Sequence, residues 1–324
     1  MSAFFNVNRM EFLVTKNCNS RCKHCSVITP TTVADCSFAN LDKLFSAIEK
    51  LIQIFDISSV MTYGGEPLLF PQITTGLHFF FKEKGVVRRE LITNGYISKD
   101  ADKVVEVSKL IVDSGVTQIL LSVDAFHQEN IPQYYVELLI KNILDNGFKN
   151  ILLHPAWLVN EDDDNSYNME TKKILSNLMS KFTIGVSKGN VIALAGHSRK
   201  LLAEFYEKVE LDLSRLCGEI PHTNSLTDIK NLRFLPNGNV NICRGICIGN
   251  IYEDKIETIL TKYSPYSAPL TSILLSGGVA KLVQRLNFCG ANINPSEYYG
   301  ICDLCAECIK MIEQDRTPIF LNDL

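Results

Sequence analysis

The sequence lacks the segments that mark membrane, secreted or nucleic-acid-binding proteins. Its longest apolar runs, such as Val191-Ile192-Ala193-Leu194-Ala195, are far too short to cross a bilayer. Residues 1–16 contain no basic region followed by a long apolar stretch, so no secretory signal is expected. The formal net charge is −4, and no basic block or arginine-rich stripe stands out. We therefore expect a cytoplasmic protein with neither nucleic acid nor a membrane as its partner.

Internal repeats and low-complexity segments are absent as well. The 324 residues are 46% hydrophobic, which is enough to bury a large core, and 21% charged, which argues against general disorder. Length and composition therefore predict a globular protein with one large domain and a smaller one.

Apolar strand-like and amphipathic helix-like segments alternate over the first two thirds of the chain. Strands are predicted at residues 9–15, 58–62, 89–93, 117–123, 149–159 and 190–195. Helices are predicted at residues 41–55, 70–84, 101–114, 131–146, 168–181 and 201–211. This order predicts an α/β fold with a parallel sheet and right-handed crossovers.

The pattern changes after about residue 212, where cysteines become frequent and the alternation fades. Residues 232–243 form a hairpin candidate with its turn at Pro236-Asn237-Gly238, and residues 274–286 a helix candidate. We therefore divide the chain into residues 1–211 and residues 212–324.

Eleven cysteines are unusual for a cytosolic chain of this length. A reducing compartment disfavours a disulfide framework, and the odd number leaves at least one cysteine unpaired. Three lie near the start and seven in the last third, with Cys36 alone between them as an expected ordinary thiol. Short spacings between cysteines indicate metal binding.

The first cluster is Cys18-Asn-Ser-Arg-Cys22-Lys-His-Cys25, with the spacing CxxxCxxC directly after the first predicted strand. Three thiolates on a short loop can ligate three irons of a [4Fe–4S] cluster and leave the fourth iron open for chemistry. A structural zinc ion would need a fourth ligand, which this segment alone does not supply. Chance spacing of unrelated cysteines is the other alternative.

Cys18, Cys22 and Cys25 give the chain a resemblance to the radical SAM enzymes, which carry CxxxCxxC after the first strand of a partial (β/α)6 barrel. The residue before the third cysteine is commonly aromatic in that family, and His24 fits this position. The resemblance implies that S-adenosyl-methionine (SAM) binds the open iron and is cleaved reductively to a 5′-deoxyadenosyl radical that abstracts a substrate hydrogen. It also implies an external electron donor of the flavodoxin or ferredoxin type.

Further positions resemble the SAM-binding residues of that family. Tyr63-Gly64-Gly65-Glu66-Pro67 ends the second predicted strand, at the mouth where α/β barrels keep their active sites. The resemblance implies that this stretch accepts hydrogen bonds from the SAM amino group. It also assigns Asn94, Ser122 and Arg199 to SAM or substrate, although a turn or surface role for them stays open.

Asp124 and His127 follow the fourth predicted strand and are candidate catalytic residues. A histidine can move a proton near neutral pH, and the alternative is that Asp124 caps a helix while His127 packs.

The second cysteine set combines Cys217, the GxxxxC segment ending at Cys243, and Cys302-x-x-Cys305-x-x-Cys308. This order resembles the carboxy-terminal SPASM domain, or its shorter twitch form, which binds auxiliary [4Fe–4S] clusters. The gap after Cys217 is long and cysteines are few for two clusters, so we expect one auxiliary cluster. Its expected ligands are Cys217, Cys243, Cys302 and Cys305, with Cys308 as a substitute and zinc as the alternative metal.

The order of these motifs resembles most closely the epipeptide epimerases, which modify ribosomally made peptides. The resemblance implies a peptide or protein substrate, with epimerisation, thioether or crosslink formation as the outcome. Those enzymes carry a hydrogen-donating cysteine directly after the GxxxxC cysteine, where this chain has Arg244. Cys247 is the expected substitute, with Cys289 as the alternative. A small-molecule substrate and a zinc-stabilised binding protein are the alternatives.

Overall fold

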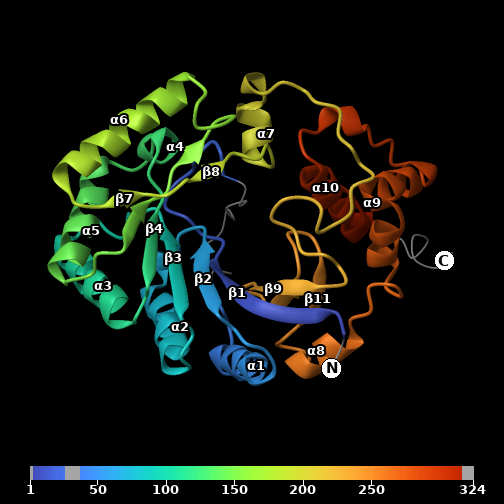
Figure 1. Ribbon diagram of the computed structural model, residues 1–324, viewed down its shortest axis with the longest axis horizontal. Coiled ribbons are helices and arrows are strands. Elements are labelled where there is room, and N and C mark those ends of the chain that lie inside the picture. The colour runs from blue at the N-terminus through green and yellow to red at the C-terminus, as the bar shows by residue number, and fades with distance from the viewer. Residues whose placement is uncertain (1–2, 26–36, 316–324) are drawn as a thin grey trace.

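The computed structural model describes residues 3–25 and 37–315, so Cys36 lies outside the described residues. Its main feature is a nine-stranded sheet in the order β11-β10-β9-β1-β2-β3-β4-β5-β7, which curves around the centre of the molecule (Figure 1). The strands are β1 (Phe5–Thr15), β2 (Ser59–Gly64), β3 (Arg88–Thr93), β4 (Gln118–Leu121), β5 (Ile151–Leu153), β7 (Gly185–Val186), β9 (Ile229–Phe234), β10 (Asn239–Asn241) and β11 (Cys247–Asn250). The pairs from β9 through β1 to β7 are parallel, which confirms the predicted α/β class.

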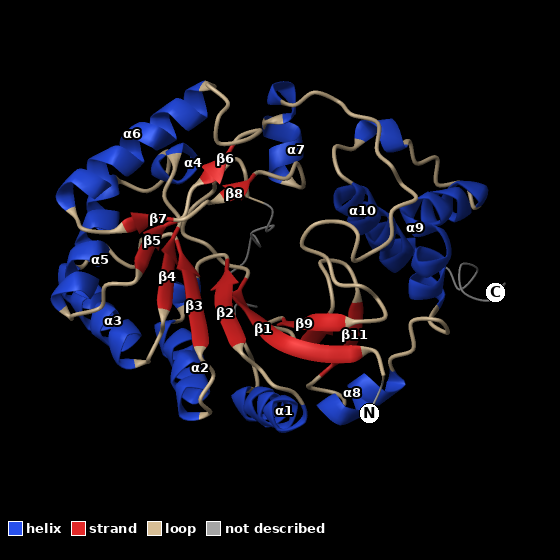
Figure 2. Ribbon diagram, in the orientation of Figure 1, coloured by secondary structure: helices blue, strands red, loops and turns tan. Residues whose placement is uncertain are grey.

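Amphipathic helices cover the outer side of this sheet (Figure 2). They are α1 (Leu41–Ile54), α2 (Pro71–Glu83), α3 (Ala101–Asp113), α5 (Gln133–Asp145) and α6 (Ser166–Lys181). Side chains of Asn40, Asp100 and Asn165 accept a backbone N–H at the start of α1, α3 and α6 and so cap these helices. Each helix returns the chain to the same edge of the sheet, and all parallel strands therefore end on one side.

Strand β1 shows why the sheet has one apolar and one polar face. Met10 and Phe12 are fully buried on the helix side, where the ring of Phe12 lies 5.5 Å from that of Phe81. The alternate residues Arg9 and Glu11 point to the other face, and Arg9 Nη1 lies 2.8 Å from a Glu90 carboxylate oxygen. Side chains alternate between the two faces of a strand. The apolar residues of β1 therefore pack under the helices, and its charged residues lie on the opposite face of the sheet.

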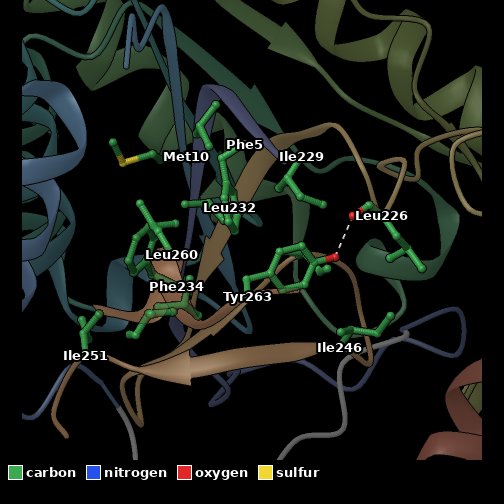
Figure 3. Close-up of a cluster of buried hydrophobic side chains, with 14 of the residues drawn as sticks. Phe5, Met10, Leu226, Ile229, Leu232, Phe234, Ile246, Ile251, Leu260 and Tyr263 are labelled. Carbon is green, nitrogen blue, oxygen red and sulfur yellow. Dashed lines mark hydrogen bonds between the residues drawn. The ribbon is translucent and has the colours of Figure 1, made fainter. Parts of the chain in front are cut away.

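The carboxy-terminal third extends the same sheet through β9 and the hairpin of β9 and β10, as predicted. Figure 3 shows one buried cluster in which Phe5 and Met10 of β1 lie with Leu232 and Phe234 of β9. The Tyr263 hydroxyl donates to the Leu226 carbonyl at 2.8 Å in this cluster. Segments before and after residue 212 therefore share one sheet and one hydrophobic core. The division of the chain into domains at residue 212 stays a prediction.

Three further helices complete this part of the chain. They are α8 (Ile256–Lys262), α9 (Pro269–Phe288) and α10 (Ile301–Asp315). Helix α9 is interrupted at Gly277 and Gly278. Gly278 has φ +60°, and a Cβ there would lie 2.6 Å from the Leu213 carbonyl oxygen, so the kink requires glycine.

Two predicted strands need correction. The long strand at residues 149–159 is broken at His154-Pro155 into β5 and β6 (Ala156–Trp157), because proline has no N–H for the sheet. The strand predicted at residues 190–195 is only β8 (Asn190–Val191), which pairs with β6 in a separate two-stranded sheet. The sixth parallel strand of the main sheet is β7 instead.

The helix predicted at residues 201–211 is also wrong. A short helix α7 (His197–Leu201) and a 3-10 turn, η2 (Ala203–Phe205), precede a non-helical segment. The Tyr206 hydroxyl donates to the Ile192 carbonyl at 2.8 Å and accepts the Val159 N–H at 3.0 Å. These two hydrogen bonds hold Tyr206 against the segments that follow β6 and β8, directly after the 3-10 turn.

Candidate active site

A cavity of about 360 Å³ lies at the carboxyl ends of β2, β3 and β4. Eleven of the residues singled out in the sequence line it: Cys18, Cys22, His24, Cys25, Tyr63, Gly64, Gly65, Asn94, Ser122, Asp124 and His127. This size falls in the usual range of small-ligand sites. The location is the edge where parallel α/β folds keep their catalytic residues.

The cysteine loop follows β1 and is tied to the end of β3. The Asn94 side-chain amide donates to the Asn19 side-chain oxygen at 2.9 Å, and the Asn19 amide donates to the Tyr96 carbonyl at 2.5 Å. Asn94 Nδ2 also lies 3.7 Å from Cys18 Sγ. These contacts fix the first thiol in a loop that has no regular secondary structure of its own.

Burial changes the chemistry of these thiols. It raises the pKa of Cys18 to about 11 and that of Cys22 to about 12. Without metal the two thiols hold their protons at neutral pH, and iron has to displace those protons on binding. Three sulfur donors on one loop at the wall of a cavity could ligate three irons of a [4Fe–4S] cluster, and the fourth iron would then have no ligand from this loop.

Gly64 and Gly65 serve a close backbone contact that differs from the expected one. A Cβ at Gly65 would lie 2.0 Å from the Asn17 carbonyl oxygen, and one at Gly64 would lie 2.3 Å from that of Thr15. The Gly65 N–H donates to Thr15 O at 2.7 Å, and the Glu66 N–H donates to Asn17 O at 2.7 Å. The glycines therefore let the end of β2 lie directly against the loop that leads to Cys18.

Glu66 is fully buried and does not line the cavity. Its carboxylate accepts hydrogen bonds from Leu68 N at 2.9 Å, Thr93 Oγ1 at 2.7 Å and Asn94 N at 2.8 Å. Burial raises the pKa of Glu66 to about 7, although these donors act to lower it. The side chain thus joins the ends of β2 and β3, and the expected contact of this carboxylate with SAM has no support in the geometry.

Asp124 and His127 form a buried pair at the start of the short helix α4 (Ala125–Gln128), which the sequence did not reveal. The Asp124 carboxylate accepts from His127 N at 2.9 Å, lies 2.8 Å from His127 Nδ1, and accepts from Ala156 N at 3.0 Å. Burial acts to raise the pKa of Asp124, but the neighbouring imidazole outweighs it and lowers this pKa to about 2. Burial conversely acts to lower the pKa of His127, and Asp124 raises it overall. Asp124 thus caps α4, and both side chains lie at the cavity wall.

His24 packs beside this pair. Its ring centroid lies 4.9 Å from that of His127 and 5.1 Å from that of Phe126. Burial and the neighbouring His127 lower the pKa of His24 to about 4, so the ring is neutral. Potential ligand atoms of Cys22, His24 and His127 lie within 4.8 Å of one another, so two imidazoles flank the second thiol.

Sequence reasoning did not place His154, Asn190 or Arg244 at this cavity, although all three line it. The His154 ring lies between the Ser187 hydroxyl, 2.7 Å from Nδ1, and the Asn190 amide, 2.8 Å from Nε2. His154 directly follows β5, and the rule that places active-site residues at strand ends identifies it. No local signal identifies Arg244, because it reaches the cavity from the loop between β10 and β11.

Arg199 lies elsewhere than expected and is not among the residues that line the cavity. Its guanidinium binds the Asp303 carboxylate at 2.8 Å and lies 4.9 Å from the centre of the Tyr298 ring. It therefore links α7 to α10, and the geometry gives no support for contact with SAM.

The second cysteine set converges from three distant segments. Burial raises the pKa of the Cys305 thiol, and so do the nearby thiols of Cys243, Cys217, Cys308 and Cys302. Cys302 and Cys305 lie about one helical turn apart on α10, so both can face the same neighbours.

Cys308 differs from the other thiols of α10. It is fully buried and belongs to the main hydrophobic core. Neither Cys217 nor Cys243 is among the groups that shift its pKa, which burial raises to about 11.

The spacing of these thiols bears on the zinc alternative. A tetrahedral zinc ion with Zn–S bonds of about 2.3 Å brings its sulfurs within about 4 Å of one another. Within the described part of the chain, the only such group with ligand atoms inside 4.8 Å is Cys22, His24 and His127. Of Cys217, Cys243, Cys302 and Cys305, no three have their sulfurs within this distance of one another, which suits a cluster several atoms across better than a single zinc ion.

Cys247 lies on β11 and is exposed. Its thiol donates to the Gly249 carbonyl at 3.3 Å, and it is not among the residues that line the cavity. The geometry therefore gives no support for its expected catalytic role.

Substituting Gly65 by alanine tests the close contact at the cysteine loop. We expect Gly65→Ala to lower the free energy of unfolding by about 1–3 kcal/mol, because the new methyl group meets a carbonyl oxygen that cannot move without breaking hydrogen bonds. Gly76 in α2 is the matched control, because a methyl group added there would have no atom within 4 Å. We expect Gly76→Ala to stabilise by roughly 0.5–1 kcal/mol, as alanine does within a helix. Anaerobic urea unfolding measures both, and equal effects would contradict the contact.

None of the helices in the described ranges is long and apolar enough to span a membrane.

Comparisons with known proteins agree with this geometry. Residues 12–169 match the family model of the radical SAM superfamily. A GTP 3′,8-cyclase of Helicobacter pylori is 29% identical over 137 residues, which cover 41% of this chain and 39% of that protein. A GTP 3′,8-cyclase of Saccharophagus degradans is 20% identical over 311 residues, or 85% of this chain and 89% of that protein. The chain thus covers well under half the length of the Helicobacter relative that it matches.

Among solved structures, histidine-tagged anSMEcpe with bound AdoMet superimposes with a TM-score of 0.52 at 12% identity, covering 98% of this chain and 96% of that one. At this identity the likeness concerns the fold alone. The family match spans the cysteine loop, the glycine pair and the Asp124–His127 pair. Over residues 12–169, just under half of its length, the chain is therefore similar to the radical SAM superfamily.

Proposed function

We propose that Cys18, Cys22 and Cys25 hold a [4Fe–4S] cluster whose open iron binds SAM in the adjoining cavity. The observation that carries the proposal is that all three thiols line one cavity together with the ends of β2, β3 and β4. When bound, this group supplies one-electron cleavage of the sulfonium carbon–sulfur bond and a carbon radical that abstracts hydrogen.

The surrounding residues have separate tasks in this proposal. Asn94 and Asn19 hold the first thiol in place, and the Glu66 carboxylate holds Asn94 through its backbone N–H. The backbone at Gly64 and the Ser122 side chain line the volume left for SAM. Asp124 holds His127 at the cavity wall, where the imidazole can bind or exchange a proton with a polar group of the substrate.

We further propose one auxiliary [4Fe–4S] cluster held by Cys217, Cys243, Cys302 and Cys305. The mutual proximity of these thiols supports it. Cys308 is the weaker candidate, because it is buried in the hydrophobic core. Four thiolate ligands would leave this cluster without an open iron, so it would exchange electrons and would not bind substrate directly. An electron donor of the flavodoxin or ferredoxin type would reduce the clusters.

For the substrate we propose a small molecule. The names of the relatives support this choice, because a GTP 3′,8-cyclase acts on a nucleotide. The modification of a peptide, which the motif order predicts, has no such support among these relatives and remains the second candidate.

Metal analysis and spectroscopy of the anaerobically reconstituted protein test the cluster assignments. We expect roughly eight iron and eight sulfide per chain for two clusters. We also expect an electron paramagnetic resonance signal in the reduced protein that changes when SAM is added. Zinc in place of iron, or a signal indifferent to SAM, would overturn the proposal.

Turnover assays separate the two substrate classes. The reduced enzyme is incubated with SAM and either GTP or a set of candidate peptides, and products are followed by mass spectrometry. Increased 5′-deoxyadenosine together with a modified nucleotide would support a small-molecule substrate. A mass or chirality change confined to a peptide would favour the second candidate.

A cysteine substitution tests the expected hydrogen donor. Because Cys247 is exposed and does not line the cavity, we expect Cys247→Ala to leave both the amount and the identity of the product unchanged. Product analysis by mass spectrometry after turnover checks this. A changed product would restore Cys247 as a donor and would require the β10–β11 loop to move toward the cavity.

A further inference from the structure

The cavity wall carries few charged side chains. Asp124 is the only carboxylate among the lining residues, and His127 and the Ala156 N–H already occupy its oxygens. Arg244 is the only lysine or arginine among the same residues. A guanidinium keeps its charge at any pH at which the protein is folded. Within the described part of the chain, the cavity wall therefore carries one guanidinium and one carboxylate.

Arg244 sits between the two groups of thiols. It directly follows Cys243, and it also lines the cavity that contains Cys18, Cys22 and Cys25. Its charge acts on Cys302 and Asp303 of α10 and on Tyr63 at the end of β2.

Tyr63 supplies a second donor at the same wall. Its hydroxyl oxygen is buried and makes no hydrogen bond of normal geometry within the described residues. The Arg233 guanidinium lies 5.8 Å from the centre of its ring and acts to lower its pKa through its charge and a hydrogen bond toward the hydroxyl. A guanidinium can only donate, so the phenol proton has no acceptor among the described residues. Burial raises the pKa of Tyr63 to about 12, so the hydroxyl keeps that proton. Buried polar groups without a partner are rare in folded proteins, and a ligand can satisfy this one.

We propose that Arg244 and Tyr63 form a subsite that binds an anionic oxygen group of the substrate, a phosphate or a carboxylate. This inference rests on the proposed function and specifies its substrate class. The planar guanidinium matches both groups with two parallel hydrogen bonds, and the phenol adds a third donor. An anion held here would place the rest of a small substrate in the cavity beside the SAM volume.

Calorimetric titration of the reconstituted, SAM-saturated protein tests the subsite with two probes at equal ionic strength, inorganic tripolyphosphate and tricarballylate. We expect saturable binding of at least one probe, and the tighter one identifies the group as phosphate or carboxylate. Arg244→Gln is expected to weaken this binding by about ten-fold or more, as is usual for loss of a charge-assisted hydrogen bond. Lys281→Gln removes an exposed cation of α9 and is the matched control, with an expected change below about two-fold.

Tyr63→Phe keeps the ring and removes only the hydroxyl donor. It therefore tests the anion subsite even if Arg244→Gln does not fold. We expect it to weaken binding by about three-fold or more. The subsite is overturned if neither probe binds the wild-type protein, if Arg244→Gln and Lys281→Gln have equal effects, or if Tyr63→Phe binds as the wild type does. These failures differ from failure of the SAM assignment, because the spectroscopic response to SAM is measured separately without either probe.

Discussion

Replacing Cys18, Cys22 or Cys25 by alanine is expected to reduce 5′-deoxyadenosine formation to the level of a protein-free control. Among the residues that the structure describes, these three thiols are the only sulfur donors that line the cavity. With one missing, the loop offers two ligands to a cluster that needs three. Chromatography of anaerobic reactions with dithionite and SAM measures the product.

The matched control for these variants is Cys289→Ala. Cys289 is exposed at the end of α9 and does not line the cavity. We expect this variant to keep both its iron content and its SAM cleavage. Each variant of the cysteine loop should retain only the iron of the auxiliary cluster, about four per chain. SAM cleavage that survives in Cys22→Ala would remove the cluster assignment altogether.

Replacing Asp124 by asparagine is expected to lower the free energy of unfolding by roughly 3–5 kcal/mol, the usual cost of breaking a buried ion pair. The Asp124 carboxylate is fully buried and joins three partners from α4 and β6: His127 N, His127 Nδ1 and Ala156 N. An asparagine presents one acceptor and one donor there, so at least one N–H group loses its partner. His127, now without its counter-charge, is buried as a neutral ring.

Urea unfolding under anaerobic conditions measures this loss, with Asp145→Asn as the matched control. Asp145 also pairs with a cation, the Lys141 ammonium at 2.5 Å, but both side chains are more than half exposed. Water and salt screen such a pair, so the control should change stability by less than about 0.5 kcal/mol. If the two variants lose equal stability, the Asp124–His127 pair is not the anchor that its geometry indicates.

Much of the fold follows from local sequence patterns. The helices α1, α3 and α6 begin at Asn40, Asp100 and Asn165, whose side chains cap them, and their apolar stripes set their inward faces. Because strands alternate with these helices along the chain, the sequence predicts a parallel sheet with crossover connections. The prediction failed at Pro155 and Tyr206, where one missing N–H and two long-range hydrogen bonds override local propensity.

The sequence by itself determined that Cys18, Cys22 and Cys25 share one loop, because they lie within eight consecutive residues. Only the tertiary structure decided the inward burial of Glu66, the pairing of Arg199 with Asp303, the exposure of Cys247 and the entry of Arg244 into the cavity. Each of these depends on contacts between residues far apart in the chain, whose relative positions are set by how the sheet curves and closes. Spacing along a sequence records which groups can meet within one loop, whereas packing determines which distant groups do meet.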